Sequence, residues 1–458
     1  MSINRRKFIG STILAGASTL VTANVENKDQ TNKVYHGPNG KLGVAVFGVG
    51  ARGRGHVESL LYRNDCDVVA INDIDQDSID QCKAIFTKLG KPLPQVYLGN
   101  ETYYLEALKN PAIDAVLIAS PWEWHSNMIT AAMKAGKYVA TEVCGAFSLD
   151  ECWELVNTSE ATGKHLFFLE NVCYRRDIMA VLNMVRQNMF GELLHLEGGY
   201  QHDLREVKFN NGKQLYGGGV EFNEKGYSEA RWRTRHSVYR NGDLYPTHGL
   251  GPVAMMADIN RGNRLTYLTS MSTKARGLHD YVINGPNGGP SHPNANVEFK
   301  LGDVTTTLIK CNNGETITLF HDTNLPRPYS LGFRVQGTKG LWMDVNQSLM
   351  IEGKTPKHAW TKADDMLKTY DHALWKKYEK SAENAGHGGM DWFVLNSFIE
   401  SAKKNEAPAI DVYDAATWLS ITALSEESIA LGSTPVAIPD FTRGRWMKRI
   451  NAFAQGDY

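Results

Sequence analysis

The 458-residue sequence lacks the charge imbalance that marks several functional classes. Its 49 Lys and Arg residues nearly balance its 50 Asp and Glu residues, so the formal net charge is −1. A chain without excess positive charge has no electrostatic basis for binding nucleic acid or an anionic membrane. We therefore expect no nucleic acid as a partner and favour a small neutral molecule.

The sequence is also poor in cysteine and has no cysteine pair at metal-ligand spacing. There is no CxxC motif and no close grouping of cysteine with histidine, so no metal site is predicted. The cysteines are scattered through predicted strands and helices, which favours buried free thiols over a disulfide framework. They are Cys66, Cys82, Cys144, Cys152, Cys173 and Cys311.

No stable membrane span is predicted, because the apolar run at the N-terminus is too short to cross a bilayer. This run, Phe8–Ala23, follows Arg5 and Arg6 and ends in Val-Thr-Ala, a plausible cleavage site. The paired arginines resemble the twin-arginine export signal, which carries folded proteins. We predict a signal peptide over 1–23 and a polar tether over 24–40, and therefore a periplasmic or secreted protein. For residues 1–23, a general secretory signal or an uncleaved anchor is the alternative to a twin-arginine signal.

The composition, with 42% hydrophobic and 22% charged residues, is typical of a globular protein of two or three domains. Strand-like runs at 44–48, 68–71, 113–120, 137–142 and 164–171 alternate with helical patterns, which predicts a parallel sheet. Ser148 and Glu151 form the pattern of a capping box before the helix at 149–163. We predict a doubly wound Rossmann domain, α/β in class, over residues 41–171.

From Gly191 onward the sequence pattern changes to short runs that alternate between apolar and polar residues, are rich in β-branched side chains and are joined by Asn-Gly and Gly turns. This pattern predicts an α+β domain over 172–458 with a mixed, largely antiparallel open sheet. Two insertions, at 201–247 and 277–294, are longer than ordinary connections, and loops of that length are often functional.

A glycine fingerprint lies at the first strand-to-helix turn of the predicted Rossmann domain. Gly48, Gly50 and Gly53 stand as G-V-G-A-R-G between a strand and a helix, the context in which this spacing binds a dinucleotide pyrophosphate. Asp73 follows twenty residues after Gly53, where a carboxylate accepts from a ribose 2′-OH and repels a 2′-phosphate. NAD is therefore the predicted cofactor, in preference to NADP.

Further cofactor contacts are expected at neighbouring strand ends. Ala51 and Arg52 should lie against the pyrophosphate, and Trp122 and His125 in "SPWEWH" should line the nicotinamide side of the crevice.

The stretches "KYVATEVCGAFS" and "ENVCYRR" resemble the Gfo/Idh/MocA-type oxidoreductases from Lys41 to the C-terminus. That resemblance implies a Rossmann domain followed by an α+β domain whose open sheet faces the cofactor. Most dehydrogenases of this superfamily carry Glu-Lys-Pro where this chain has Glu142-Val143-Cys144. The lysine associated with acid–base work in hydride transfer is absent, which disfavours a plain sugar dehydrogenase.

Longer strings sharpen the resemblance: "LEGGYQHDLR", "ARWRTRHSVYRNGDLYPTHGLGPVA", "LPRPYSLGF" and "HGGMDWF". Together with the leader they are similar to glycoside hydrolase family 109, NAD-dependent enzymes described as α-N-acetylgalactosaminidases. The implied reaction is hydrolysis by C3 oxidation, C2 deprotonation, elimination, water addition and re-reduction, on a glycoside or the non-reducing end of a glycan. Such an enzyme needs no external NAD, which reconciles the fingerprint with export.

The resemblance implies a role for each candidate site residue. His248 is expected to handle the C3 hydroxyl proton, because imidazole can accept and return a proton near neutral pH. Tyr174 and Tyr329 are the alternatives for the C2 proton. The predicted substrate-binding residues are Tyr200, Arg233, Tyr245, Pro246, Thr247, His248 and Tyr329, and the further cofactor-binding residues are Glu142, Val143 and Asn171.

Other interpretations stay open at this point. A lone histidine is more often structural, and each tyrosine can be a packed aromatic. His387 and Asp391 are equally typical of the start of a helix. An exported NAD(P)-dependent sugar or polyol oxidoreductase and a non-catalytic, NAD-containing sugar-binding protein are the alternative functions, and a homo-oligomer is left open.

Overall fold

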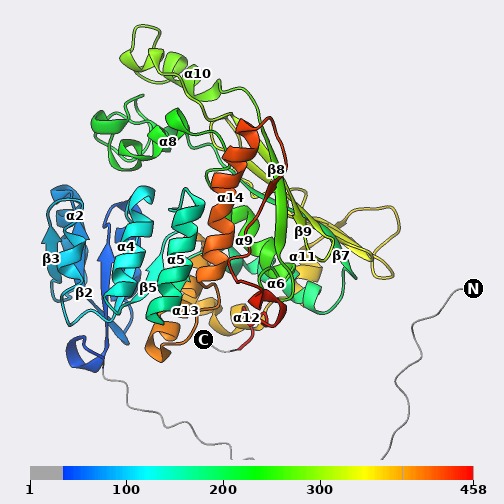
Figure 1. Ribbon diagram of the computed structural model, residues 1–458, viewed down its shortest axis with the longest axis horizontal. Helices are drawn as coiled ribbons and strands as arrows, with labels where there is room; N and C mark the ends of the chain where they lie inside the picture. The colour runs from blue at the N-terminus through cyan, green and yellow to red at the C-terminus, as the bar shows by residue number, and fades with distance from the viewer. Residues whose placement is uncertain (1–34, 384, 457–458) are drawn as a thin grey trace, which may run out of the picture. The chain divides into compact units, whose positions relative to one another are not determined.

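The computed structural model describes residues 35–383 and 385–456 (Figure 1). The predicted signal peptide, and residues 24–34 of the predicted tether, lie outside these residues. The described end of the tether contains a short 3-10 helix, η1 (Pro38–Gly40), before the first strand. No helix in the described part of the chain is long and apolar enough to cross a membrane.

The first sheet has six parallel strands in the order β3-β2-β1-β4-β5-β6. Its strands are β1 (Leu42–Phe47), β2 (Cys66–Asp73), β3 (Gln95–Leu98), β4 (Ala115–Ile118), β5 (Tyr138–Thr141) and β6 (Leu166–Phe168). The connecting helices are α1 (Ala51–Leu61), α2 (Gln76–Lys88), α3 (Tyr104–Ala107), α4 (Trp122–Lys134) and α5 (Leu149–Thr162). The strand order reverses beside β1, which is where open sheets of this type bind ligands. The predicted doubly wound sheet is confirmed.

Local sequence signals explain several element boundaries in this sheet. Every residue of β1 is buried, as expected for a parallel strand covered on both faces. Ser148 Oγ accepts from the backbone N–H of Glu151 at 3.2 Å, and the Glu151 carboxylate accepts from the N–H of Ser148 at 3.0 Å. The predicted capping box therefore begins α5, and Gly163 ends it in the left-handed conformation.

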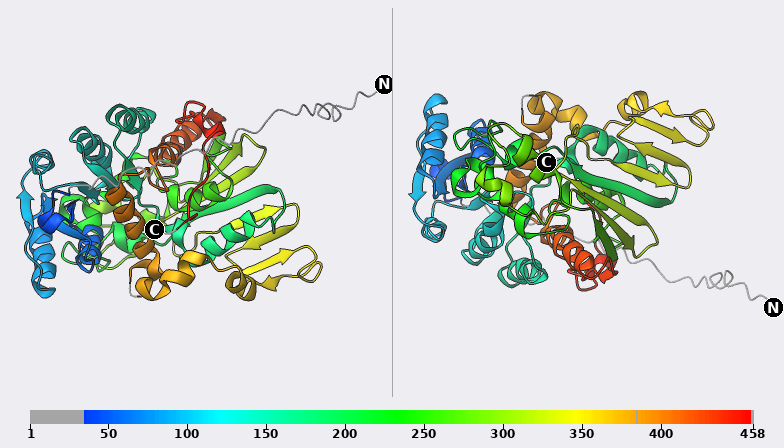
Figure 2. Two further views of the ribbon diagram at one scale, coloured as in Figure 1. Left: turned by 90° about the horizontal axis from the view of Figure 1, so that it is seen from below. Right: turned by 90° about the horizontal axis from the view of Figure 1, so that it is seen from above.

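The second sheet has nine strands in the order β14-β13-β12-β11-β7-β10-β9-β8-β15. Only the pairing of β7 with β10 is parallel among its described strands, so the predicted mixed, largely antiparallel sheet is confirmed. Its strands are β7 (Leu193–Gln201), β8 (Leu265–Ser272), β9 (Val304–Cys311), β10 (Thr316–Asp322), β11 (Arg334–Gly337), β12 (Gly340–Met343), β13 (Ser348–Ile351), β14 (Thr361–Lys362) and β15 (Val436–Ala437). Figure 2 shows both sheets from two further directions.

Helices from the C-terminal part of the chain join the two sheets. Helix α14 (Val412–Ala430) packs against both α5 and β8, and Phe398 on α13 (Met390–Lys404) packs edge-on against Phe167 of β6 (Figure 1). The predicted domain boundary at 171/172 falls inside η2 (Asn171–Tyr174), between the sheets. The other helices are α6 (Arg176–Arg186), α7 (Arg205–Lys208), α8 (Arg233–Tyr239), α9 (Thr247–Met256), α10 (Gly277–Asn284), α11 (Asp364–Thr369) and α12 (Ala373–Ala382).

Helix α9 lies unusually close to strand β7, and glycines make this approach feasible. A Cβ on Gly198 of β7 would stand 2.3 Å from the carbonyl oxygen of Gly249 on α9, and a Cβ on Gly249 would meet the backbone N of Gly199 at 2.3 Å. The close approach brings Tyr200, at the end of β7, beside His248 at the start of α9; their ring centroids lie 5.4 Å apart.

The six cysteines all lie in the described part of the chain, and all are free and buried. Burial raises the pKa of each thiol for which a shift is resolved, so these side chains behave as apolar core groups. The predicted free thiols are confirmed.

Candidate functional site

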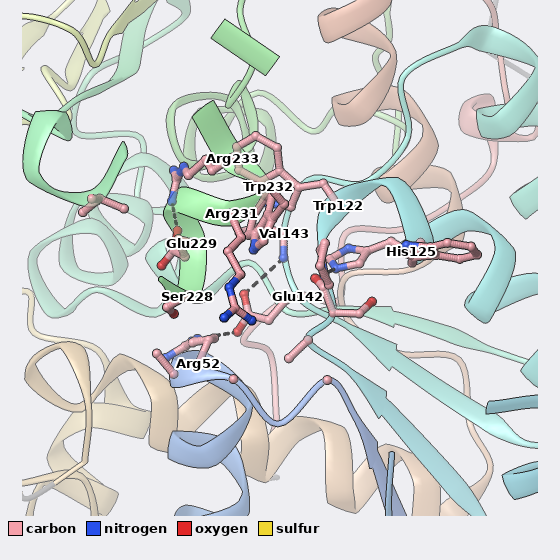
Figure 3. A pocket seen from close by; sticks show the side chains of 18 of the residues that line it. Arg52, Trp122, His125, Glu142, Val143, Ser228, Glu229, Arg231, Trp232 and Arg233 are labelled. Carbon is pink, nitrogen blue, oxygen red and sulfur yellow. Dashed lines mark hydrogen bonds and ion pairs between the residues drawn. The ribbon is translucent and has the colours of Figure 1, made fainter. Parts of the chain in front are cut away.

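A cavity of about 630 Å³ lies at the carboxyl ends of the parallel strands and extends toward β7 and α9. Its size is in the range of small-molecule and cofactor sites. Figure 3 shows Arg52 on one side of it and Trp232 and Arg233 on the opposite side. Fourteen of the predicted site residues line it: Gly48, Gly50, Ala51, Arg52, Asp73, Trp122, His125, Glu142, Val143, Asn171, Tyr200, Arg233, Tyr245 and His248.

The glycine loop fits a dinucleotide. Gly48 has a φ of +81°, and a Cβ there would stand 2.5 Å from the backbone N of Ser120. A Cβ on Gly53 would meet the Gly48 carbonyl oxygen at 1.9 Å, so Gly53 permits the packing of α1 against the loop and does not itself line the cavity. Gly50 faces open space at the N-cap of α1, where backbone N–H groups can meet a pyrophosphate.

Asp73 is held at the loop by backbone donors. Its Oδ2 accepts from the N–H of Val49 at 2.7 Å and its Oδ1 from the N–H of Asp75 at 3.0 Å. Burial raises the pKa of Asp73, while these hydrogen bonds oppose the increase. The carboxylate lines the cavity and retains acceptor capacity, so it fits the predicted contact with ribose hydroxyls.

Arg52 lines the cavity, but its guanidinium is occupied by protein carboxylates. Its Nε donates to Glu142 Oε1 at 2.6 Å, and its two terminal nitrogens donate to Asp391 at 2.6 and 3.0 Å. Asn171 donates to the same Asp391 at 2.8 Å, and His56 Nε2 lies 2.6 Å from Glu142. This network ties α1 to α13. The group of Arg52 that is available for the predicted pyrophosphate contact is therefore its backbone N–H, because its guanidinium is already paired.

The network also controls the charge of its carboxylates. Although burial opposes ionisation, the charge of Arg52 and the hydrogen bond with His56 hold the pKa of Glu142 well below its usual range. Burial also opposes the ionisation of Asp391, but its hydrogen bonds with His387 and Arg52 hold the pKa of Asp391 well below its usual range. Both carboxylates are ionised at neutral pH.

The backbone at Cys144, where most dehydrogenases of the superfamily carry the proline of Glu-Lys-Pro, does not fit a proline. Cys144 adopts a φ of +69°, which a proline ring cannot reach because it fixes φ near −65°. Cys144 Sγ lies 3.5 Å from the carbonyl oxygen of Leu244, and Val143 lines the cavity with a side chain that can neither donate nor accept a proton. This strand end therefore offers no general acid or base after Glu142.

His125 is a structural residue as well as a lining one. Its Nε2 lies 2.8 Å from the Ser120 carbonyl oxygen, and its Nδ1 lies 3.1 Å from that of Cys144 and 3.3 Å from Thr141 Oγ1. Burial lowers the pKa of His125. Its polar atoms are thus used within the protein, and it presents only its ring to the cavity.

His248 forms a pair with a carboxylate that sequence reasoning did not single out. Its Nδ1 lies 2.7 Å from Oε1 of Glu170, a fully buried residue that follows β6 and occupies the N-cap position of η2. The same Oε1 accepts from the N–H of Val172 at 3.1 Å, which fixes its position. With Nδ1 oriented by Glu170, Nε2 is the nitrogen that can exchange a proton with a ligand. The pair has the geometry of an oriented general base.

Aromatic side chains and one arginine form the wall opposite the cofactor loop. Tyr200 stacks on Tyr245 with ring centroids 4.3 Å apart. The Arg233 guanidinium lies 5.4 Å from the Tyr245 ring centroid and 4.9 Å from that of Trp122, and it pairs with Glu229. Burial raises the pKa of Tyr200 to about 12, so this hydroxyl is a hydrogen-bond donor at neutral pH. Flat rings beside a fork of donors suit a sugar.

The structure does not bring Tyr174 to the cavity, which argues against its predicted role. Tyr174 is fully buried, its ring lies parallel to Phe393 and edge-on to Phe453, and it does not line the cavity. Tyr329 is half exposed beside the site, with ring centroids 6.4 Å from Tyr200 and 4.9 Å from His202. Burial of its hydroxyl raises the pKa of Tyr329, the opposite of what a base requires.

Pro246 and Thr247 do not line the cavity either. Pro246 caps α9, and Thr247 is fully buried in its first turn. These residues set the position of His248 and do not contact the cavity themselves. The described residues contain no group of three or more potential ligands that could hold a metal ion.

Comparison with known proteins identifies the family. Residues 174–448 match the family described as "Glycosyl hydrolase 109, C-terminal domain". The chain belongs to glycosyl hydrolase family 109. Residues 42–169 of this family-109 member match "Oxidoreductase family, NAD-binding Rossmann fold", so the first domain is an NAD-binding domain.

Relatives cover this family-109 chain almost completely. A "Glycosyl hydrolase family 109 protein" of Stenotrophomonas maltophilia is 50% identical over 99% of this chain and 98% of the relative. An "Alpha-N-acetylgalactosaminidase" of Tannerella forsythia is 48% identical over 99% of this chain and all of the relative.

Solved structures share the fold at low identity. A myo-inositol dehydrogenase of Lactobacillus casei in complex with NAD(H) and myo-inositol matches with a TM-score of 0.57 at 17% identity, covering 88% of this chain and 99% of that one. A levoglucosan dehydrogenase in complex with NADH and levoglucosan matches with a TM-score of 0.61 at 14% identity, covering 87% of this chain and all of that one. These matches confirm the expected architecture.

Proposed function

We propose that this family-109 member is an exported α-N-acetylgalactosaminidase. It would hydrolyse terminal α-N-acetylgalactosamine residues of glycosides or glycans, with bound NAD as an internal redox cofactor. The observation that carries this proposal is the His248–Glu170 pair, whose histidine lines the same cavity as the glycine loop and Asp73. The name of the Tannerella relative supports the substrate. Bound NAD would supply reversible oxidation of the sugar at C3, which acidifies the hydrogen at C2.

His248 takes the C3 hydroxyl proton and returns it at the end of turnover. Glu170, 2.7 Å from Nδ1, stabilises the imidazole while it carries the extra proton. Because the cavity wall after Glu142 lacks an ionisable side chain, this pair supplies the proton transfer that a lysine supplies in related dehydrogenases.

The remaining roles fall to the aromatic wall. Arg233 and Tyr200 donate to sugar hydroxyls or to the acetamide carbonyl. With Tyr174 buried in the core, Tyr329 is the predicted residue for the C2 proton. Burial raises its pKa, and the positive charge of Arg175 is the described influence that opposes this increase. The twin-arginine signal and the periplasmic or secreted location belong to this proposal and rest on residues 1–23.

A pair of incubations separates this function from the alternatives. The purified protein is mixed with p-nitrophenyl α-N-acetylgalactosaminide without added cofactor, and nitrophenol release is followed. Release supports the glycosidase, provided that His248→Ala lowers it by about 10²–10⁴-fold. A parallel incubation contains added NAD⁺: its net reduction without nitrophenol release indicates the oxidoreductase. The absence of both reactions indicates the sugar-binding protein, and either of these two results would overturn the proposal.

A further inference from the structure

The two long insertions form a small lobe with its own hydrophobic core. We call residues 205–239 and 277–299 the roof lobe. Its core is separate from the main core of the described chain and is built from Phe209, Val220, Phe222, Leu278, Tyr281 and Val282, with Val238, Ala295, Val297 and Phe299 packed around them. A lobe with a separate core can move relative to the rest of the protein without exposing the main core.

The roof lobe covers the Asp73 side of the cavity. Asp73, Asp75 and Ser78 line this part from the Rossmann domain, and Tyr227 and Arg231 line it from the lobe. Figure 1 shows α8 and its neighbouring loops over the ends of α2 and α4. Since Asp73 marks the expected ribose position, the lobe lies across the path by which the adenosine half of the cofactor would leave.

The lobe contacts the Rossmann domain differently at its two ends. At α4 the contact is both aromatic and ionic: the Trp122 ring lies 5.1 Å from Trp232 and 5.3 Å from His236, and Arg235 of the lobe pairs with Glu123. At α2 the contact is polar. Tyr227 donates its hydroxyl proton to Asp77 at 2.9 Å, and Arg231 lies 3.5 Å from Asp75.

Tyr227 is held in place from both sides. Gln81 donates to the Tyr227 hydroxyl at 3.0 Å and to Asp77 at 2.7 Å, which closes a triangle of hydrogen bonds. Inside the lobe, fully buried Asn210 accepts from the Tyr227 N–H at 3.0 Å and donates to its carbonyl oxygen at 2.8 Å. These two hydrogen bonds from the Asn210 side chain fix the backbone of Tyr227, and with it the position of the hydroxyl that contacts α2.

We propose that the contact of Tyr227 and Arg231 with α2 is a latch that retains NAD in the protein. The aromatic and ionic contacts at α4 anchor the lobe, and breaking the contact at α2 opens the cavity at the Asp73 side. The inference rests on the proposed function, because an exported enzyme that returns its cofactor to the starting oxidation state gains from slow release. The latch acts on cofactor exchange and leaves the His248–Glu170 pair untouched.

The test measures exchange of bound NAD, not turnover. Protein purified with its NAD is placed in excess isotopically labelled NAD, and the label on the protein is followed by gel filtration and mass spectrometry. We expect the double variant Tyr227→Phe/Arg231→Ala to exchange about tenfold faster than the wild type, equivalent to about 1.4 kcal/mol. The matched control is Tyr239→Phe, which removes the hydroxyl of an exposed tyrosine in the same lobe and should leave exchange unchanged.

Equal exchange rates in the double variant and the wild type would overturn the latch, as would wild-type protein that exchanges NAD within seconds. A thermal melt of each variant separates local opening from unfolding: a latch variant keeps the wild-type melting temperature while exchange accelerates. An accelerated exchange that merely tracks a lowered melting temperature would also count against the latch. Because the readout is label on the protein, it holds whether or not the protein hydrolyses the proposed substrate.

Discussion

Replacement of Glu170 by glutamine tests the proton-transfer pair while keeping the shape of the side chain. Glu170 is fully buried and its Oε1 lies 2.7 Å from Nδ1 of His248, so the contact is a hydrogen bond to a charged group with little solvent screening. Such bonds contribute about 1.5–3 kcal/mol. At about 1.4 kcal/mol per tenfold, we expect Glu170→Gln to lower kcat/KM by roughly 10–150-fold.

The assay is nitrophenol release under steady-state conditions, with NAD content measured on the same preparations. The chain offers a matched control, because His195 Nε2 pairs with Glu197 Oε1 at 3.0 Å on β7, outside the cavity lining. Glu197→Gln should leave kcat/KM unchanged. Since Glu170 acts through His248, the double variant Glu170→Gln/His248→Ala should be no slower than His248→Ala alone. Full activity of Glu170→Gln, or additive losses in the double variant, would refute the reasoning.

Three further predictions concern the cofactor loop, the network between α1 and α13, and a buried aspartate. Asp73→Ala should weaken NAD binding by about 1.5–3 kcal/mol, seen as lower nucleotide content after dialysis; unchanged content would contradict the ribose contact. Asp391→Asn breaks the paired contact with Arg52, whose side chain is 30% exposed. We expect the free energy of unfolding, measured by urea denaturation, to fall by about 1–3 kcal/mol. An unchanged urea midpoint would show that the network does not stabilise the protein. Burial raises the pKa of Asp243 to about 7, so the contribution of its protonated form to stability is complete at low pH and is lost as pH rises through about 7. Asp243→Asn should therefore be more stable than the wild type at pH 8 in the same denaturation assay. A more stable wild type at that pH would contradict this.

The cofactor half of the site could be predicted because its signals are local. Gly48, Gly50 and Gly53 must sit at one turn, and Asp73 must end the next strand, whatever the rest of the chain does. Their positions follow from strand order and backbone sterics alone. The same reasoning placed Trp122 and Asn171 at strand ends that face the cavity.

Partners that meet only through tertiary packing could not be predicted in this way. Arg52 and Asp391 are 339 residues apart, and Glu170 and His248 are 78 apart, so no local spacing connects them. The sequence predicts an unpaired Arg52 beside the glycine loop. The charge of Arg52 is instead paired by Asp391, because α13 packs against the first sheet. A signal for Glu170 did exist, because it is an acidic residue that directly follows a hydrophobic run and precedes Asn171.

Tyr174 shows the opposite failure, in which proximity along the chain misleads. It follows Asn171 by three residues, but the turn of η2 directs its ring into the core against Phe393. The roles of the long insertions were equally hidden, because their apolar residues form a separate core only when residues 205–239 meet 277–299.

The fate of the C2 hydrogen shows most directly whether hydrolysis proceeds through C3 oxidation and C2 deprotonation. The enzyme with its bound NAD hydrolyses p-nitrophenyl α-N-acetylgalactosaminide in deuterium oxide, and the released sugar is examined by proton NMR and mass spectrometry, with an enzyme-free incubation of the sugar as the control. We expect deuterium at C2 of the enzymatic product and none in the control. A product that keeps its original hydrogen at C2 in fully deuterated solvent, formed at the normal rate, would contradict it.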